Sequence, residues 1–169
     1  QQLLTLARQE PGGGERQSTS VNLVELAVRV IAEHLPLAEA RRIDLGATPT
    51  SEAVRVDGDE DALRILLGNL VSNALRYTPI GGRVDVSSGE DARCAFLEVC
   101  DSGPGIPVDE RQRVFDRFYR RAQTDEAGSG LGLAIVRTIA DRHRACVVLD
   151  DAPLGGLRAR VEFSRSLAP

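Results

Sequence analysis

Apolar residues recur at helical spacing in three stretches of the chain. In the most regular stretch they follow the i, i+3, i+4 rule without a gap, at Leu63, Leu66, Leu67, Leu70, Val71 and Ala74. An earlier helix is predicted to begin after the capping residue Asn22 and to kink or end at Pro36, which cannot donate a helical hydrogen bond. A later helix is predicted over residues 131–142.

Other apolar segments alternate with polar residues or form short runs, as strands do. Strands are predicted over residues 43–45, 53–56, 83–87, 95–100, 145–149 and 157–163. Residues 108–114 form a short predicted helix, and residues 115–128 have too little periodicity for a regular element. Because the strands come partly in adjacent pairs, a wholly parallel sheet is not expected. The predicted fold class is α/β, a two-layer sandwich of one mixed β-sheet with three main helices on one face.

Length and composition exclude several classes of protein. With 169 residues, of which 42% are hydrophobic, the chain suits one globular domain. Its net charge of -4 does not favour a general nucleic-acid surface, and no apolar run approaches the roughly 20 residues that span a bilayer. All 21 basic residues are arginine, which excludes phosphate-binding loops and Schiff-base sites that depend on lysine.

The three cysteines lack the spacing of a metal site or a disulfide framework. An odd, scattered count fits a reduced protein interior. Cys94 and Cys100 lie six residues apart in a predicted strand and so face the same side. We expect them to be small core residues.

Polar residues border the apolar face of the most regular helix. Asn69 and Asn73 lie four residues apart, with Arg76 three further on, so the three share one stripe. Mg²⁺ accepts an amide oxygen beside phosphate oxygens and waters, which makes Asn69 and Asn73 candidate metal ligands. The alternative is a capping or solvent-exposed polar stripe.

A glycine-rich turn follows a predicted strand at residues 101–107. Asp101 ends the strand, and Gly103 and Gly105 allow the backbone to approach a flat ligand. An ionised carboxylate only accepts hydrogen bonds, so Asp101 suits the exocyclic amine of adenine and repels the keto oxygen of guanine. The alternative is an ordinary turn.

A second glycine-rich segment, residues 128–133, leads into the last predicted helix. Free N–H groups at a helix start attract anions such as phosphate. Between the two glycine segments, residues 111–121 carry five arginines and one aspartate, a charge of +4 in an acidic chain. These arginines can grip phosphate oxygens, with Phe115 and Phe118 pinning the loop to the body, or they can form a solvated face.

The order of these four segments resembles the ATP-binding domain of bacterial sensor histidine kinases. Residues 69–79 resemble the N box of that family, residues 101–107 its first glycine box, residues 114–120 its F box and residues 128–133 its second glycine box. The resemblance extends over residues 20–163. It implies the Bergerat fold, an α/β sandwich, and the binding of ATP and Mg²⁺.

The resemblance also implies a role for each matching residue. Asp101 would accept a hydrogen bond from the adenine amine, and Tyr77 would lie against the base. Asn73 would ligate Mg²⁺ with Asn69 close by, and Arg76 would lie near the phosphates. The other nucleotide-binding positions implied are Gly103, Gly105, Ile106, Phe115, Gly128, Ser129, Gly130, Leu131, Gly132 and Leu133.

Residues 115–128 would form a lid over the nucleotide. Arg117, Arg120 or Arg121 would reach the phosphates from this lid. Catalysis is assigned to Asn69, Arg117 and Arg120, because phosphoryl transfer depends mainly on positioning and charge neutralisation.

The chain departs from the family pattern in two places. The His-Gly-Gly that often follows the last helix is His143-Arg144-Ala145 here, and the box with the phosphoacceptor histidine is absent. The two histidines, His34 and His143, are both expected to be structural. Residues 1–11 are interpreted as the end of the hairpin helix that bears the acceptor, residues 12–19 as a linker and residues 20–165 as the ATP-binding domain.

These interpretations predict the catalytic domain of a protein-histidine kinase. It would donate the γ-phosphoryl group of ATP to a histidine on an upstream helical hairpin, for relay to a response regulator, and could not phosphorylate itself. The expected setting is the cytoplasmic part of an inner-membrane sensor, monomeric as this chain and homodimeric at full length, with no nucleic-acid partner. Two alternatives stay open: a serine kinase of the anti-sigma type, and a degenerate domain that only docks partners.

Overall fold

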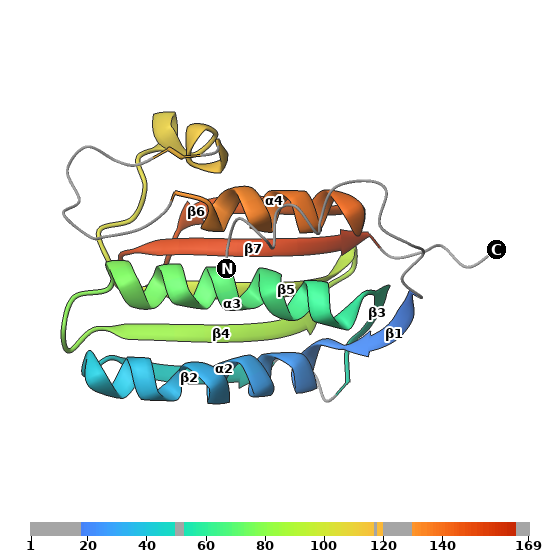
Figure 1. The fold of residues 1–169 in the computed structure, drawn as a ribbon, viewed down its shortest axis with the longest axis horizontal. Helices are drawn as coiled ribbons and strands as arrows, with labels where there is room; N and C mark the ends of the chain where they lie inside the picture. The colour runs from blue at the N-terminus through green and yellow to red at the C-terminus, as the bar shows by residue number, and fades with distance from the viewer. Residues whose placement is uncertain (1–17, 50–52, 117, 120–129, 165–169) are drawn as a thin grey trace.

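Three amphipathic helices lay their apolar faces on one side of a β-sheet (Figure 1). The computed structural model describes residues 18–49, 53–116, 118–119 and 130–164. The helices are α2 (Leu23–Ala40), α3 (Glu60–Tyr77) and α4 (Gly132–Arg142), with short 3-10 turns η1 (Val108–Glu110) and η2 (Arg113–Phe115). The strands are β1 (Thr19–Asn22), β2 (Asp44–Pro49), β3 (Arg55–Gly58), β4 (Arg83–Glu90), β5 (Cys94–Asp101), β6 (Ala145–Asp151) and β7 (Leu157–Ser164).

The main sheet is mixed, with the strand order β2-β4-β5-β7-β6. β2 runs parallel to β4, and the other neighbouring strands are antiparallel. The predicted α/β sandwich is therefore confirmed. β1 and β3 form a separate two-stranded sheet, however, so the prediction of a single sheet is wrong. β1 escaped prediction because only one of its four residues, Val21, is apolar.

The core lies between the helices and the sheet, and α3 occupies its middle. Leu63, Leu66 and Leu67 of α3 are fully buried, as the helical pattern predicts. α3 contacts both other helices and lies over β5, so its polar stripe comes close to the end of that strand. Among the described helices, none combines the length and the apolar character that a bilayer crossing requires.

α2 begins as predicted but ends later. The side chain of Asn22 caps it, accepting a hydrogen bond from the N–H of Val24 at 3.0 Å. The helix continues through Pro36 to Ala40, so the predicted end at that residue is wrong, while a kink there stays a prediction. Proline removes only one helical hydrogen bond, and the turn after it is held by packing, since Ala38 is 1% exposed. The N–H of Ile43 then donates to the Ala38 carbonyl at 2.9 Å and closes the helix end.

Cys94 and Cys100 share one side of β5, as their spacing predicts, but that side is not the core. The intervening residues Ala95, Leu97 and Val99 belong to the core, so both cysteines face outward from the sheet. Cys94 is nevertheless buried, being 7% exposed, whereas Cys100 is only partly buried, so the expectation of small buried residues is confirmed for Cys94 and wrong for Cys100. An even spacing fixes a common side without fixing which side. Burial against the outer face still raises the pKa of the Cys100 thiol to about 12.

Both histidines join elements of the fold, in keeping with the structural role expected for them. Nε2 of His34 in α2 lies 3.1 Å from the hydroxyl of Ser72 in α3. Nε2 of His143, at the end of α4, accepts a hydrogen bond from the N–H of Asp59, the capping residue of α3, at 3.0 Å. In each histidine Nδ1 lies 2.7 Å from the helical carbonyl four residues earlier. The two contacts tie α2 and α4 to α3.

The residue after His143 has the backbone conformation for which the family pattern often supplies glycine. Arg144 has a φ of 52°, a left-handed conformation that favours glycine. Replacing Arg144 with glycine should raise the free energy of unfolding by about 0.5–1 kcal/mol, measured by urea denaturation. Arg144→Ala removes the same side chain without relieving the backbone, so it is the control. Equal stabilities of the two variants would count against this prediction.

Candidate functional site

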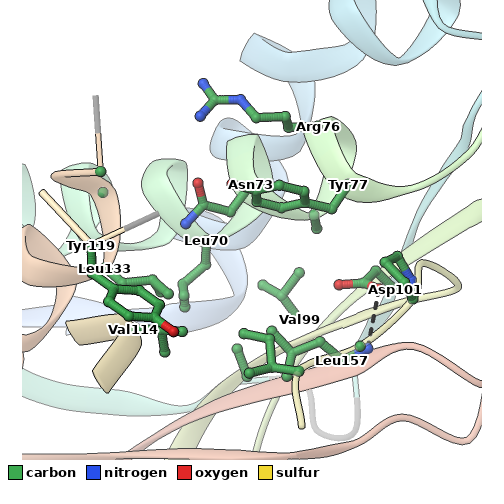
Figure 2. Close-up of a pocket in the computed structure, with 17 residues that line it drawn as sticks. Leu70, Asn73, Arg76, Tyr77, Val99, Asp101, Val114, Tyr119, Leu133 and Leu157 are labelled. Atoms are coloured by element: carbon green, nitrogen blue, oxygen red, sulfur yellow. Dashed lines mark hydrogen bonds between the residues drawn. The ribbon is translucent and has the colours of Figure 1, made fainter. Parts of the chain in front are cut away.

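A pocket of about 1050 Å³, counted to its open mouth, lies between α3, the ends of β5 and β7, and the start of α4 (Figure 2). The candidates from the sequence that line it are Asn73, Arg76, Tyr77, Asp101, Gly105, Ile106, Gly130, Gly132 and Leu133. The lining residues that the sequence did not single out are Leu70, Ala74, Val99, Pro104, Val114, Tyr119, Leu157 and Ala159.

Asp101 lies at one end of the pocket and is 5% exposed. Its Oδ1 accepts hydrogen bonds from the N–H of Gly103 at 2.8 Å and from the N–H of Leu157 at 3.1 Å. Among the described residues both bonds go to Oδ1, which leaves Oδ2 for a ligand, and Figure 2 shows the carboxylate facing the cavity. Burial raises the pKa of the Asp101 carboxyl, while the two N–H donors oppose that shift.

The turn between β6 and β7 supports Asp101 from behind. A Cβ atom at Gly156 would lie 2.3 Å from the backbone oxygen and from Oδ1 of Asp101, so no side chain fits there. The next residue, Leu157, supplies both an N–H to Asp101 and a side chain to the pocket. The sequence placed Gly156 only in a connecting turn, because no local pattern reveals a contact across more than fifty residues.

The walls beside Asp101 are apolar. Val99 of β5 and Leu157 of β7 lie on one side of the cavity, and Leu70 of α3 lies on the other (Figure 2). The ring of Tyr77 also borders the slot and is partly exposed. An apolar slot that ends in one buried acceptor can bind a planar heterocycle that carries an amine.

Asn69 and Asn73 meet the start of α4. A Cβ atom at Gly132 would lie 3.3 Å from Oδ1 of Asn69 and 3.4 Å from Oδ1 of Asn73. Nδ2 of Asn69 donates to the Ile65 carbonyl at 2.8 Å, so Oδ1 is the atom it can offer a ligand. Leu131, the N-cap residue of α4, makes no side-chain capping bond to the first helical N–H groups. Two amide oxygens therefore adjoin a helix start whose N-cap side chain makes no capping bond.

This end of the pocket can hold a cation only together with a ligand. In the part of the chain that the structure describes, no three His, Cys, Asp or Glu side chains gather around a metal position. Mg²⁺ needs about six oxygen ligands, so phosphate oxygens and waters would have to join the asparagine oxygens. Figure 2 shows Asn73 between Asp101 at one end and Leu133 of α4 at the other. The pocket thus has a buried hydrogen-bond acceptor at one end and amide oxygens beside a helix start at the other.

The arginine of the polar stripe takes a different direction. Arg76 belongs to the pocket lining, but Figure 2 shows its guanidinium pointing away from the cavity. A change of rotamer is needed to bring it to a bound phosphate.

The two phenylalanines expected to pin the loop behave differently. Phe115 packs against the core, as predicted. Phe118 is 65% exposed, so the prediction that it pins the loop to the body is wrong. Its φ is 64° and its N–H donates to the Gly130 carbonyl at 3.1 Å, and this held backbone turns the side chain outward. The next residue, Tyr119, enters the pocket instead.

Other candidates lie beside the pocket or outside the described residues. Gly103 does not line the cavity, but a Cβ atom there would lie 2.9 Å from the Tyr77 carbonyl oxygen. Leu131 is 2% exposed and belongs to the core. The candidates outside the described residues are Arg117, Arg120, Arg121, Gly128 and Ser129. The arginine contacts of the lid therefore stay a prediction.

Comparison with known sequences indicates one family. Residues 58–167 match the family described as "Histidine kinase-, DNA gyrase B-, and HSP90-like ATPase". Sensor protein kinase PmrB of Pseudomonas aeruginosa is 40% identical over 95% of this chain, and sensor protein QseC of Escherichia coli is 34% identical over 96%. Since the matches cover 34% and 35% of these two relatives, the chain spans about a third of their length.

Solved structures agree with the sequences. The mycobacterial sensor histidine kinase MprB superposes with a TM-score of 0.74 at 32% identity, covering 87% of this chain and 97% of that one. Full-length ShkA in complex with AMPPNP superposes with a TM-score of 0.81 at 29% identity, covering 99% of this chain and 36% of that one.

Proposed function

From the premise that the chain belongs to the histidine kinase-, DNA gyrase B- and HSP90-like ATPase family, as the catalytic domain of a sensor histidine kinase, we propose that its pocket binds ATP with Mg²⁺ and presents the γ-phosphoryl group to a histidine outside the chain. One observation carries this proposal. Asp101 is buried at the end of an apolar slot, with Oδ1 held by two backbone N–H groups and Oδ2 left for a ligand. The similar full-length ShkA structure is a complex with AMPPNP, which supports a nucleotide as the ligand.

At the base end, Asp101 accepts the hydrogen bond of the adenine amine. Val99, Leu157 and Tyr77 exclude water from the two faces of the ring, which strengthens that bond. Guanine presents an oxygen where adenine presents the amine, so the same carboxylate repels it. Selection for adenine follows from this one contact.

At the other end, the N–H groups at the start of α4 bind phosphate oxygens, as uncapped helix starts do. Asn73, with Asn69 beside it, holds Mg²⁺ through its amide oxygen. The metal, when bound, neutralises part of the phosphate charge. Arg76 and the predicted lid residues Arg117, Arg120 and Arg121 add positive charge at the phosphates. These groups orient the γ-phosphoryl group for in-line attack, the main requirement of phosphoryl transfer.

The acceptor lies on another part of the full-length protein. His34 and His143 both make packing contacts, so neither is placed to accept a phosphoryl group. The chain spans about a third of relatives named as sensor kinases, which leaves room for a phosphoacceptor hairpin in such a protein. We assign residues 1–11 to the end of that hairpin, residues 12–19 to a linker and residues 20–165 to the catalytic domain.

The wider setting is that of a two-component system. The phosphorylated histidine would pass its group to a response regulator, and the catalytic domain would work in the cytoplasm below a membrane-bound sensor part. The full-length protein would be a homodimer, joined through its hairpin. The serine-kinase alternative is not favoured, because the relatives described above are named as sensor kinases.

Calorimetric titration with ATP and GTP, each with and without Mg²⁺, tests the nucleotide assignment. We expect saturable binding of ATP, stronger with Mg²⁺, and much weaker binding of GTP. Adding the upstream hairpin should then give phosphate label on its histidine. Failure of ATP to bind either the chain or the hairpin-containing protein would overturn the proposal in favour of a docking domain.

Replacing Asn73 with alanine should remove the effect of Mg²⁺ on ATP binding. The affinity without metal should change little, whereas the gain on adding Mg²⁺ should fall by about tenfold or more, as expected when a metal site loses a ligand. Ser72→Ala is the matched control, because this neighbouring side chain faces His34 rather than the pocket. An unchanged Mg²⁺ effect in the Asn73 variant would remove that residue from the metal site.

A further inference from the structure

Arg111, which the proposed function does not use, is partly buried beside the base end of the pocket. Its side chain is 14% exposed although it carries a charge. Nε donates to the carbonyl oxygen of Ile106 at 2.9 Å, and Nη1 donates to that of Leu149 at 3.4 Å. Nη2 pairs with the carboxylate of Asp151. One guanidinium thus reaches three hydrogen-bond acceptors from two separate parts of the chain, and its Nη1 also lies 3.8 Å from the carboxylate of Asp150.

The first of these partners belongs to the turn that binds the base. Ile106 lines the pocket, and Gly105 before it has a φ of 69°, so the turn takes a conformation that has to be held in place. Ile106 also packs against the core. The hydrogen bond from Arg111, which does not line the pocket itself, holds the backbone of this wall.

The other two partners belong to the end of β6, an edge strand of the sheet. β6 leads directly into the turn that carries Gly156 and Leu157, the two residues that support Asp101. The base-binding turn also lies against this turn, since a Cβ atom at Gly105 would be 3.4 Å from the Gly156 carbonyl oxygen. Arg111 therefore links the turn at Ile106 to the end of β6, the strand that precedes the turn supporting Asp101.

The chemistry of the side chain matters here. A guanidinium is a rigid planar fork that donates in several fixed directions, whereas the ammonium group of lysine is a single point of charge. Hydrogen bonds from a charged donor in a sheltered position are about twice as strong as neutral ones. Lysine at this position can reach one of the three acceptors at good geometry but cannot serve all of them.

We propose that Arg111 is a positioning residue of the nucleotide site: by holding the Ile106 carbonyl to the end of β6, it sets the width of the slot beside Asp101 and so controls the affinity for the adenine base. This inference rests on the proposed function. Arg111 makes no contact with the nucleotide in this scheme, and its effect passes through the backbone of the two turns.

The test is calorimetric titration of Arg111→Ala and Arg111→Lys with adenosine and with ATP and Mg²⁺. Arg158→Ala is the matched control. Arg158 shares the partner Asp150 with Arg111, pairing with it at 2.9 Å, but none of its hydrogen bonds among the described residues goes to the Ile106 carbonyl. The unaltered chain and the Asp101→Asn variant are measured in parallel.

For Arg111→Ala we expect the affinity for adenosine and for ATP to fall by the same factor, about tenfold or more, with the stoichiometry unchanged. Arg111→Lys should show a smaller loss, and Arg158→Ala should bind within about twofold of the unaltered chain. A side chain needed only for folding would lower the stoichiometry and leave the dissociation constant of the folded fraction unchanged.

Three outcomes would overturn the inference. The first is full affinity in Arg111→Ala while Asp101→Asn loses affinity, which leaves the proposed function intact. The second is a lowered stoichiometry with an unchanged dissociation constant, which assigns Arg111 to folding alone. The third is absence of binding by the unaltered chain, which removes the proposed function together with the inference.

Discussion

Replacing Asp101 with asparagine should weaken ATP binding by roughly 1–3 kcal/mol, or about 5- to 150-fold, and should at the same time stabilise the unliganded chain. The substitution keeps the shape of the side chain. The amide oxygen can still accept the N–H groups of Gly103 and Leu157 at the place of Oδ1. Only the group that faces the cavity changes, from an acceptor to an N–H donor, which opposes the adenine amine.

The gain in stability has a separate cause. Burial raises the pKa of the Asp101 carboxyl, which means that folding disfavours its ionised form. At neutral pH this group therefore lowers the free energy of unfolding, and a neutral amide removes that penalty. Urea denaturation of both forms measures the gain. Asp57→Asn, the same change at an exposed position of β3, is the control and should alter neither stability nor affinity.

Acidification should act on the unaltered chain in the same direction. Between the ordinary aspartate pKa of about 4 and the raised pKa of Asp101, the folded chain binds more protons than the unfolded chain. The contribution of this group to stability therefore increases as the pH falls through that window, while ATP affinity decreases because the protonated carboxyl loses its charge. In Asp101→Asn both pH effects should disappear. Unchanged ATP affinity in this variant would remove Asp101 from the base site.

Replacing Gly156 with alanine should damage both the fold and the site. The added Cβ would lie 2.3 Å from two oxygens of Asp101 and 2.6 Å from the N–H nitrogen of Gly103. Most of these atoms belong to the backbone, so the clash can be relieved only by moving the turns apart. We expect a loss of about 1–3 kcal/mol in the free energy of unfolding, as for overpacked cores, and a loss of at least about tenfold in ATP affinity.

Gly155→Ala is the matched control for this prediction. Gly155 has a φ of 92°, but a Cβ atom there meets no atom within 4 Å. Alanine should strain the backbone by about 1 kcal/mol and leave ATP affinity nearly unchanged. Denaturation and calorimetry on the two variants separate backbone strain from steric pressure on Asp101. Equal ATP affinity in the two variants would show that Gly156 does not shape the base site.

The residues with distinctive chemistry could be predicted because their signals are local. Asn69 and Asn73 share a stripe through helical periodicity alone, and Asp101 follows an apolar run and precedes two glycines. The central helix could be predicted for the same reason, since its leucine spacing lies within one continuous segment. The choice of an α/β sandwich followed from the order of helices and strands.

Local signals also misled wherever a neighbour in space decided the outcome. Pro36 indicates a helix end, yet packing of the following turn keeps this residue within α2. The sequence predicts that Phe118 packs against the body of the domain. Its backbone is instead hydrogen-bonded to Gly130, and the neighbouring Tyr119 lines the pocket. Cys94 and Cys100 share a side by parity, while only the docking of the helices decides that this side faces away from the core.

The sequence by itself determined the helices, most of the strands, the common stripe of Asn69 and Asn73, and the acceptor at Asp101, because each depends on residue type and short-range spacing. Only the tertiary structure decided which backbone groups hold that acceptor, why Gly156 must be glycine, and how Arg111 joins the turn at Ile106 to the distant end of β6. These contacts join residues far apart in the chain. The spacing of residues along the chain does not predict these contacts, because they form only when strands pair and helices pack.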